Sequence, residues 1–412
     1  MTRTSDLPRI RAGSPPSGHG RLLPGTATQD LGVHHELHGK LPWPTDPASL
    51  IAAVEAAGLT GRGGAAFPTW RKLAAVRAGP QPVVVANAAE SEPASRKDRV
   101  LMAEAPHLVL DGLQLAAAAV GAKQAYLYAS MDADNLADLL DRRRAANWDR
   151  IPVTVLVAPH DFVAGEESAV VAAVEGRPAM PRDKPVLVSE SGVRGNATLV
   201  QNVETLAHLA LIARHGAHWF RALGTDEDPG SFLATVSGCV VTPGVHEFPY
   251  GVPLGATLHA AGGPSAVVQA VLVGGFHGAW LPPDGDLPVT RRTLHPFLAA
   301  PGAGLVIALP IEACGLVASS TVVDYLAEQS AGQCGPCKIG LPEMALTLRR
   351  LAEGERSTVL AARVERLATM VTGRGACHHP DGTARLVRST LRAFGREVEL
   401  HLAGRCRVRD GG

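Results

Sequence analysis

The sequence predicts an α/β domain with a mostly parallel sheet, followed by a small β-rich domain and a helical bundle. Between residues 47 and 157, short apolar runs such as VVVAN, AYLYA and VTVLV alternate with helical patterns. This order is typical of parallel strands joined by crossover helices. From residue 229 onward, Gly and Pro interrupt short apolar runs, and four amphipathic patterns follow from residue 315. These two sequence patterns predict the β-rich domain and the bundle, respectively.

The composition fits a globular protein and excludes several classes of partner. Of 412 residues, 46% are hydrophobic, and 39 basic residues balance 39 acidic ones. The balanced charge gives no reason to expect nucleic acid as a partner. The apolar runs are shorter than the roughly 20 residues of a membrane helix, so we expect no membrane insertion. No secretory signal is visible, and six cysteines with one C-x-x-C pair predict metal or redox chemistry in the cytoplasm.

The elements are expected in the following order. The first 35 residues, rich in Pro, Gly and Ser, predict a flexible N-terminal arm. Periodic patterns predict helices at 47–57, at 106–120, through residue 144 and from about Leu199, and strands beginning at Val83, Ala125 and Val153. The expected domains are an arm at 1–35, the α/β domain at 36–228, the β-rich domain at 229–312, the bundle at 313–395 and a loose tail at 396–412.

The stretch GLTGRGGAAFPTWRK, residues 58–72, is a candidate phosphate-binding loop. Gly61, Gly63 and Gly64 allow sharp turns and a close approach of the backbone to an anion. Gly61, Gly63 and Ala66 also fit the dinucleotide template G-x-G-x-x-G/A, but that template follows a strand, and the preceding ASLIAAVEAAGL is helical. The residues alone leave a phosphate cradle and an ordinary Gly-rich turn equally open.

Two acidic segments follow predicted elements. Asn87, Glu90 and Glu92 come after the VVVAN strand, at the edge where open α/β sheets bind ligands. Glu166 and Glu167 come at a helix start, where negative charge is favourable, so they either compensate the helix dipole or belong to a ligand site.

A third polar segment lies in TLVQNVETLAHL. Gln201, Asn202 and Thr205 fall near the first turns of the helix expected from about Leu199. In that position they either hydrogen-bond a ligand or cap the helix.

Three cysteines in the helical region form a candidate metal site. SAGQCGPCKIG contains Cys334 and Cys337, and Cys377 lies in a later loop that a bundle folds onto the same end. The spacing fits an iron–sulfur cluster, a tetrahedral Cys₃His zinc site completed by His378 or His379, or an incidental pair of cysteines.

Five stretches, taken together and in this order, resemble a known family: GLTGRGGAAFPTWRK, NAAESEPASRKDR, GEESAVVAAVEGRPAMPRDKP, SGVRGNATLVQNVETLAHL and SAGQCGPCKIG. The chain from about Gly58 to Phe394 resembles the flavin-carrying, NADH-oxidising subunit of respiratory complex I and related diaphorase subunits of NAD-linked hydrogenases and formate dehydrogenases. The resemblance implies an α/β FMN-binding domain, a ubiquitin-like β-grasp domain and a four-helix bundle with a [4Fe–4S] cluster.

The resemblance also implies roles for individual residues. Glu92 and Lys184 match positions that touch the nicotinamide nucleotide, Phe67 stacks on its adenine, and Glu92 and Glu167 are the expected catalytic residues. Cluster ligands are Cys334, Cys337 and Cys377. The residues implied for FMN are Gly61, Arg62, Gly63, Gly64, Lys72, Asn87, Glu90, Gly165, Glu166, Glu167, Gln201, Asn202 and Thr205.

The implied reaction is hydride transfer from NADH to FMN, followed by transfer of single electrons through the cluster. The implied acceptor is a ferredoxin-like or thioredoxin-like [2Fe–2S] partner within a hetero-oligomer. In such enzymes the flavin performs the chemistry, while the protein orients it and tunes its potential.

The chain departs from the family pattern around the flavin and the nucleotide. Ala89 stands where the family has an acid that faces the flavin, and Gln201 replaces an asparagine. Ala75 and Leu187 stand at positions of aromatic residues that stack on adenine. Because each aromatic pair contributes about 1 kcal/mol, we expect weaker NADH binding and a retained flavin site.

The cluster motif departs as well. Ala331 stands where the family has its first cysteine ligand, which leaves three matched cysteine ligands. With solvent at the fourth position, the cluster would be site-open or contain three irons. Candidates for the fourth ligand are Cys314, His378, His379, Cys406 and solvent, although a straight helix from residue 315 to 329 would be about 20 Å long and separate Cys314 from the motif.

Three hypotheses follow. The first is an electron-transfer flavoprotein with FMN and an iron–sulfur cluster. The second is a non-catalytic relative of the same fold, an assembly or metal-binding subunit that has lost the acid at Ala89 and the ligand at Ala331. The third is a nicotinamide-dependent dehydrogenase with a structural Cys₃His zinc, which requires a strand directly before Gly61.

Overall fold

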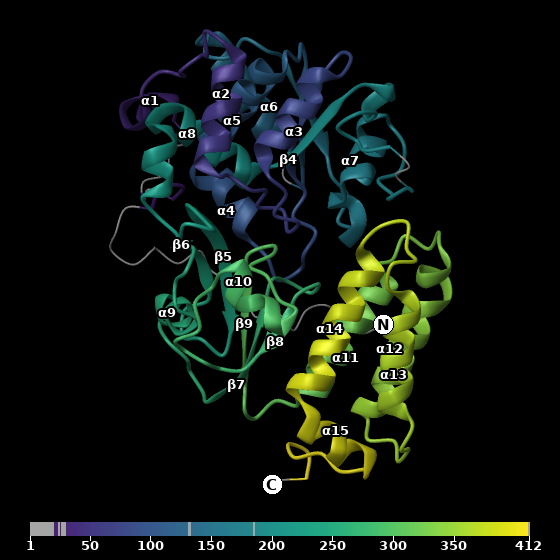
Figure 1. Cartoon of the computed structure of the whole chain (residues 1–412). Helices are drawn as coiled ribbons and strands as arrows, with labels where there is room; N and C mark the ends of the chain where they lie inside the picture. The colour runs from purple at the N-terminus through teal and green to yellow at the C-terminus, as the bar shows by residue number, and fades with distance from the viewer. Residues whose placement is uncertain (1–19, 24, 26–29, 131–132, 184–185, 411–412) are drawn as a thin grey trace. The chain divides into compact units, whose positions relative to one another are not determined.

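The computed structural model describes residues 20–23, 25, 30–130, 133–183 and 186–410. The chain divides into two compact units, the first built mainly from residues up to 234 together with 245–252, and the second from residues 235–244 and 253–412. Figure 1 shows the helices and strands of both units and labels many of them. None of the helices in the described part of the chain combines the length and the hydropathy that a membrane crossing requires.

The first unit contains a four-stranded parallel sheet in the order β3-β2-β1-β4. Its strands are β1 (Val83–Ala88), β2 (Ala125–Ala129), β3 (Val153–Val157) and β4 (Thr198–Asn202). The predicted parallel sheet is therefore confirmed. β4 lies on the side of β1 opposite to β2 and β3, so the strand order reverses between β1 and β4. Open α/β sheets bind ligands beside the carboxyl ends of the strands at such a reversal.

Helices cover both faces of this sheet. Val84 and Ala86 of β1 belong to the apolar core that also contains the buried side chains of α5 and α8, whereas Val83 and Val85 pack in a second core with α7. This alternation is the period of two expected for a strand with two buried faces. The helices are α1 (Leu31–His38), α2 (Pro47–Ala57), α3 (Thr69–Ala78), α4 (Lys97–Glu104), α5 (Pro106–Val120), α6 (Ala133–Ala145), α7 (Glu167–Val174) and α8 (Val203–Arg221), with 3₁₀ turns η2 (Phe162–Gly165) and η3 (Val193–Gly195).

The Gly-rich loop is entered from a helix. α2 begins after Asp46, whose carboxylate accepts the N–H of Ala48, and ends at Gly58, which adopts a left-handed conformation with φ 71°. Both signals are typical of helix ends, and the predicted helix at 47–57 is confirmed. Because α2 stands where a dinucleotide fingerprint needs a strand, the third hypothesis lacks the element it requires.

The helix predicted from about Leu199 was wrong in its first residues. Residues 198–202 form β4, which pairs with β1 so that Leu199 lies beside Val84 and Asn202 beside Asn87. α8 begins only at Val203, with Asn202 as its N-cap. Pairing with a buried neighbouring strand outweighs the helical pattern of the residues that follow.

The predicted N-terminal arm is also partly wrong. Residues 1–19 lie outside the described part of the chain, but Leu22 and Leu23 are buried in the core of the first unit. The N–H of Leu22 donates to Glu247 Oε2 at 2.8 Å, and α1 begins at Leu31, inside the predicted arm. Apolar burial and hydrogen bonds of Arg21, Leu22 and Leu23 fix a segment that its Pro and Gly content marked as loose.

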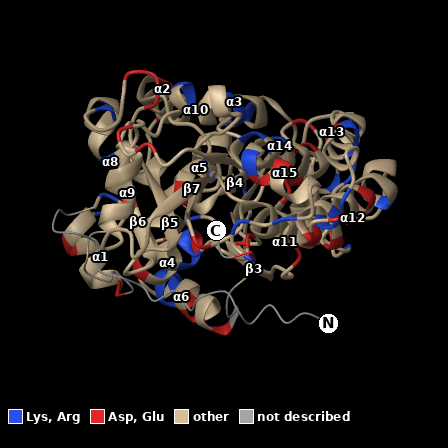
Figure 2. Cartoon of the chain, turned by 90° about the horizontal axis from the view of Figure 1, so that it is seen from below, with Lys and Arg blue, Asp and Glu red and all other residues tan. Residues whose placement is uncertain are grey.

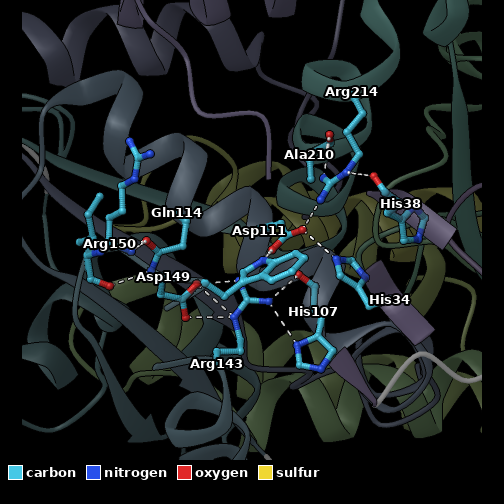
Figure 3. A network of polar contacts seen from close by, with 12 residues as sticks. His34, His38, His107, Asp111, Gln114, Arg143, Asp149, Arg150, Ala210 and Arg214 are labelled. Atoms are coloured by element: carbon cyan, nitrogen blue, oxygen red, sulfur yellow. Dashed lines mark hydrogen bonds and ion pairs between the residues drawn. The ribbon is translucent and has the colours of Figure 1, made fainter. Parts of the chain in front are cut away.

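A cluster of buried charges holds α1, α5, α6 and α8 together (Figure 3). Asp111 accepts hydrogen bonds from Arg143, at 2.7 Å, and from Arg214, and from the His34 ring at 2.8 Å. Arg143 also pairs with Asp149 at 2.6 Å. Burial alone would raise the pKa of Asp111, but these cationic neighbours hold that pKa well below its ordinary value. We call His34, Asp111, Arg143, Asp149 and Arg214 the Asp111 cluster.

A five-stranded mixed sheet follows, in the order β6-β5-β9-β7-β8. β5 pairs with β9 in parallel, and β7 pairs with β8 and β9 in antiparallel fashion. β5 and β6 run from one unit into the other. The elements are β5 (Ser231–Gly238), β6 (Gly244–Pro249), α9 (Leu254–Ala260), β7 (Val268–Val273), β8 (Ala279–Leu281), α10 (Arg291–Leu294), η4 (His295–Phe297) and β9 (Leu305–Pro310).

The C-terminal region is helical, as predicted from residue 315. Its helices are α11 (Gly315–Glu328), the π-helical turn η5 (Pro336–Gly340), α12 (Leu341–Ala352), α13 (Leu360–Val371), α14 (His379–Ala393) and α15 (Gly395–Leu402). The loose tail predicted from residue 396 was wrong, because α15 occupies its beginning and buries Val398 and His401. Figure 2 shows acidic and basic residues intermingled along these helices, as the balanced composition implies.

Candidate functional site

The Gly-rich loop is closed at its base. Thr60 and Pro68 form an isolated bridge, and the N–H of Gly61 donates to the carbonyl of Phe67 at 2.9 Å. Gly64 has φ 114°, and a Cβ placed there would meet no atom within 4 Å. The loop therefore has open space at a position that only glycine adopts without strain, as a backbone cradle for a ligand requires.

This loop lies over the carboxyl end of β4. A Cβ at Gly63 would stand 3.4 Å from the Asn202 Cβ, and one at Gly61 would stand 3.9 Å from Gln201 Nε2. The N–H of Arg62 donates to Thr205 Oγ1 at 2.8 Å. The structure thus joins two of the predicted segments at the point where the strand order reverses.

A third predicted segment, which contains Gly165, contacts the carboxyl end of β1. Asn87 Nδ2 donates to the carbonyl of Gly165 at 3.0 Å, and Asn87 Oδ1 accepts the N–H of Ala89. A Cβ at Gly165 would stand 3.2 Å from the Ala89 carbonyl and 3.4 Å from Ser91 Oγ. Since Asn87 and Asn202 pair in register on β1 and β4, all these residues gather at one edge of the sheet.

The adjacent acids of the α7 start have different partners. Glu166 is the N-cap and accepts the N–H of Ser168 at 2.8 Å, so its charge lies at the helix start, where the helix-dipole explanation offered from the sequence places it. Glu167 instead pairs with Lys72 Nζ at 2.6 Å. Lys72 also donates to the carbonyl of Val200 on β4, at 3.0 Å, so this lysine links α3, α7 and the sheet.

The remaining predicted residues occupy different environments. Glu90 caps α4, because its carboxylate accepts the N–H groups of Asp98 and Arg99 at 3.0 and 3.1 Å. Burial and the nearby Asp98 raise the pKa of Glu90. Glu92 is half-buried, and the Phe67 side chain is 47% exposed. Lys184 lies outside the described residues.

Gln201 is buried on β4, and its side-chain amide lies 3.5 Å from Thr69 Oγ1. Asn202 accepts the N–H of Glu204 as the N-cap of α8 and donates to Asp98 Oδ2 at 2.8 Å. These contacts fix both amides at the edge of the sheet.

A buried ionic cluster beneath the loop was not predicted from the sequence. Lys97 Nζ lies 2.7 Å from Asp98 Oδ1 and 2.8 Å from Glu204 Oε2. Arg62 Nε lies 4.0 Å from Glu204 Oε1. We call Arg62, Lys97, Asp98 and Glu204 the Lys97 cluster. Burial opposes the charge of Lys97, but the two carboxylates raise its pKa above the ordinary value.

The Arg62 guanidinium is directed into the protein. It donates to the Thr60 hydroxyl at 2.9 Å and to the Ser231 carbonyl at 3.2 Å, and it lies 4.7 Å from the centre of the Tyr250 ring. The side chain is only 3% exposed. Arg62 therefore supports the loop from below through its side chain, which leaves only its backbone for contact with a ligand.

One signal in the sequence pointed to this cluster. Glu204 is a charged residue at the head of the apolar stretch TLAHLALI, and Lys97 and Asp98 follow a loop already singled out for its acids. Charged residues that are fully buried are rarely found without a partner. Pairing these three residues, however, requires the tertiary contact between α4 and α8, which no local pattern supplies.

The structure brings the three predicted cysteines together. The backbone N–H groups of Cys337 and Ala376 donate to the Cys334 sulfur and lower the pKa of that thiol, although burial opposes them. Burial, the hydrogen bond with Cys334 and the charges of Cys334 and Cys377 raise the pKa of Cys337 to about 11. The turn before α12 and the loop before α14 therefore meet, with Cys337 and Cys377 3% and 7% exposed.

The candidates for a fourth ligand are placed differently. Cys314 is the N-cap of α11, at the opposite end of that 14-residue helix from the Cys334 turn, a separation of about 20 Å. Both ring nitrogens of His379 are engaged, with the Leu326 carbonyl at 2.7 Å and with His277 at 3.1 Å. His378 directly follows Cys377, is exposed, and pairs with Asp381. Cys314 therefore lies too far from the Cys334 turn to be the fourth ligand of that cluster, whereas His378 stays a candidate.

Comparison with known proteins agrees with this geometry. Residues 54–211 match the family model of the Nuo51 FMN-binding domain. Residues 318–401 match the NADH-ubiquinone oxidoreductase-F iron–sulfur binding region. The first match spans the Gly-rich loop and the edge formed by β1 and β4, and the second spans the three cysteines.

Relatives match almost the whole chain. The F 2 subunit of the NADH-quinone oxidoreductase of Rhizobium meliloti is 32% identical over 95% of this chain and 96% of its own length. The F subunit of the Escherichia coli NADH-quinone oxidoreductase is 30% identical over 86% of this chain and 84% of its own.

Among solved structures, an NAD⁺-reducing [NiFe]-hydrogenase in the air-oxidized state is 34% identical, with a TM-score of 0.81. The match covers 91% of this chain but 65% of that one, so this chain spans slightly less than two thirds of the hydrogenase chain. The relatives of nearly equal length and the two family models lead to one conclusion: the chain belongs to the family of NADH-quinone oxidoreductase F subunits.

Proposed function

We propose that this chain is the NADH-oxidising, FMN- and iron–sulfur-carrying subunit of a multi-subunit oxidoreductase. One observation carries the proposal: the Gly-rich loop, the β1 end and the α7 start converge where Asn87 and Asn202 pair at the reversal of strand order. That position is where open α/β sheets bind nucleotide-like ligands.

The residues at this edge fit FMN. The open space at Gly64 and the exposed Gly63 provide the backbone cradle, and Lys72 provides a cation near the β4 end. We assign the phosphate and ribityl contacts to Gly61, Gly63, Gly64, Lys72 and the backbone of Arg62. Contacts around the ring system are assigned to Asn87, Glu90, Gly165, Glu166, Glu167, Gln201, Asn202 and Thr205. When bound, FMN accepts a hydride and releases single electrons.

The nucleotide contacts are assigned by the same family pattern. Phe67, 47% exposed, offers a ring for stacking on adenine, while Leu187 offers an exposed aliphatic surface instead. Glu92, Glu167 and Lys184 are assigned to the nicotinamide side. Because Glu167 is held by Lys72 at 2.6 Å, we propose that it acts as a fixed carboxylate that orients the reactants.

The iron–sulfur site is assigned to Cys334, Cys337 and Cys377. The three thiols come from two loops, and each can bind one iron at a corner of the cluster, whereas Ala331 supplies no ligand. We propose a [4Fe–4S] cluster held by these three cysteines, with His378 or solvent at the fourth iron.

The strand order of the second sheet supports a domain assignment. We propose that residues 229–312 are a ubiquitin-like β-grasp, supported by the mixed sheet whose strands, numbered within the domain, lie in the order 2-1-5-3-4. We propose that residues 313–395 are a four-helix bundle built from α11 to α14, and that residues 36–228 are the FMN domain. α15 extends the bundle beyond the predicted boundary.

The electron acceptor is proposed from the same resemblance. Relatives named as subunits of larger enzymes support a hetero-oligomer, and we propose a ferredoxin-like or thioredoxin-like [2Fe–2S] protein as the partner. All six cysteines are free, which suits the reducing cytoplasm, where we place the chain.

Cofactor content tests the proposal. The chain is purified under anaerobic conditions and denatured. The released flavin is quantified by its fluorescence, the iron is quantified by elemental analysis, and both are expressed per chain. We expect about one flavin and three to four irons, in keeping with the cluster types that three cysteines hold. A colourless protein that takes up no FMN on reconstitution would instead favour the non-catalytic relative.

The cluster assignment has its own test. Ala331→Cys supplies a fourth thiolate, so we expect a higher iron content after anaerobic purification and a changed EPR spectrum of the reduced cluster. Cys239→Ser is the matched control, because Cys239 belongs to neither loop. Equal iron content and equal spectra in the wild type and both variants would show that residue 331 does not face the cluster.

A further inference from the structure

A second group of metal-binding side chains lies at the start of α11. Cys314, His401 and Cys406 place one ligand atom each within 4.8 Å of one another, the one such group found among the described residues. All three are buried, with 7%, 1% and 5% exposed. They come from the N-cap of α11, the last turn of α15 and the turn that follows it. Neither family pattern nor sequence motif connects them.

The distances fit a tetrahedral metal ion. Cys314 Sγ and His401 Nε2 are 3.5 Å apart. In a tetrahedral zinc site, bonds of about 2.3 Å to sulfur and about 2.0 Å to nitrogen separate these two ligand atoms by about 3.5 Å. The Cys314 thiol and the His401 imidazole therefore already have the separation of two zinc ligands, and the Cys406 sulfur lies within 4.8 Å of both ligand atoms.

The histidine already has the orientation of a metal ligand. His401 Nδ1 lies 3.1 Å from the Leu351 carbonyl, which accepts a hydrogen bond and cannot donate one. This contact places the proton on Nδ1 and leaves the lone pair of Nε2 directed at the Cys314 sulfur. A backbone carbonyl behind the ring is the usual partner of a metal-binding histidine.

We propose that Cys314, His401 and Cys406 bind one Zn²⁺ ion as a structural site. Two thiolates and one imidazole are ligands that select zinc over magnesium or calcium. The Glu397 carboxylate is a candidate for the fourth position, since Oε2 lies 3.5 Å from Cys314 Sγ; it also accepts the Gly315 N–H at 2.8 Å. On binding, both thiols release their protons to solvent.

The ion would connect three segments of the chain. α11, α15 and the turn at Cys406 contribute one ligand each, and this turn is closed by the Cys406 N–H donating to Asp410 Oδ2 at 2.7 Å. The site thereby fixes the C-terminal segment against the helical region. This role does not depend on FMN, NADH or the iron–sulfur cluster.

Zinc analysis of the full chain tests this inference. After purification without chelators we expect about one zinc per chain, and less than about a tenth of that in Cys314→Ser and Cys406→Ser, because structural zinc needs its full ligand set. Cys239→Ser is the matched control and keeps the zinc. Circular dichroism of each variant shows whether it folds.

X-ray absorption spectroscopy at the zinc edge tests the site without removing any of its proposed ligands. A Cys334→Ala/Cys337→Ala variant excludes zinc bound by the other cysteines, and we expect it to keep about one zinc with two sulfur neighbours at about 2.3 Å. Zinc that disappears in this variant, four sulfur neighbours, or a Cys314–Cys406 disulfide found by thiol alkylation and mass spectrometry would each overturn the proposal.

Discussion

The first unit contains two buried ionic clusters that differ in what they support. The Asp111 cluster joins α1, α5, α6 and α8, and none of its residues belongs to a predicted ligand-binding segment (Figure 3). The Lys97 cluster lies under the Gly-rich loop and reaches it through Arg62, while Asp98 binds the amide of Asn202. The comparison indicates that one cluster stabilises the fold, whereas the other also positions the proposed flavin site.

The largest effect is expected at Asp111. Asp111→Ala leaves Arg143 without one of its two carboxylates and Arg214 without the carboxylate it binds, both in a buried environment. Removing one partner of a buried ion pair costs about 3–5 kcal/mol, so the free energy of unfolding falls by about that amount. Urea denaturation measures the loss, and FMN affinity of the remaining folded protein stays at the wild-type value. A weaker affinity would mean that the Asp111 cluster also supports the site.

A similar but smaller loss of stability is expected at Lys97, with a different consequence for binding. Lys97→Met leaves the carboxylates of Asp98 and Glu204 buried near each other, which costs about 3 kcal/mol. Because Asp98 then releases Asn202 from its present position, we expect FMN affinity to fall at least about tenfold, or about 1.4 kcal/mol. Fluorescence titration with FMN measures this change.

The double variant Lys97→Met/Glu204→Gln serves as the control. It removes one of the two carboxylates that lose the Lys97 charge, so part of the lost stability returns. Wild-type FMN affinity in Lys97→Met would separate the Lys97 cluster from the flavin site and make the two clusters equivalent.

A smaller, pH-dependent effect is expected beside the Asp111 cluster. Burial and the positive charges of His34 and Arg214 lower the pKa of His38 to about 4. The unfolded chain, with an ordinary histidine pKa near 6.5, then binds a proton that the folded chain does not bind between about pH 6.5 and pH 4. Stability is therefore fully present above pH 6.5 and decreases as the pH falls.

His38→Gln isolates this contribution. After allowing for partial exposure of the ring, we expect the wild type to lose about 1 kcal/mol more than the variant between pH 7 and pH 5. Urea denaturation at both pH values gives the difference. Equal losses in the two proteins would show that His38 titrates normally in the folded state.

The smallest effect is expected at an exposed ion pair. Arg144 and Asp141 pair on the surface of α6, with side chains 70% and 68% exposed. Such pairs contribute about 0–1 kcal/mol, so Arg144→Ala changes the free energy of unfolding by less than about 1 kcal/mol. This variant is the baseline for both clusters, and a larger loss would show that exposure is a poor guide to the energy of ion pairs in this unit.

Local signals predicted the framework of the fold well. Asp46 and Gly58 mark the two ends of α2, and apolar runs bounded by polar residues mark the first three strands. The strand at 198–202 and the helix at 395–402 were missed, because pairing with β1 and burial of His401 decide them. Tertiary contacts of this kind are absent from any short window of sequence.

The site was predicted in its outline. The five ordered stretches placed the loop, the two asparagines and two of the three cysteines, and Cys377 came from a later loop. The structure gathers these residues at two places. The Lys97 cluster beneath the Gly-rich loop was not predicted, because Lys97 and Glu204 are 107 residues apart in the sequence. The group of Cys314 and His401 was missed for the same reason, because these two residues are 87 positions apart.

Reduction of bound flavin by NADH tests the central claim most directly. The chain is reconstituted with FMN under anaerobic conditions, separated from free FMN, and titrated with NADH while the visible absorption of the flavin is recorded. We expect about one bound FMN per chain and loss of its absorption as NADH is added. Bound FMN that keeps its absorption with excess NADH, yet is bleached by dithionite, would contradict NADH oxidation by this chain.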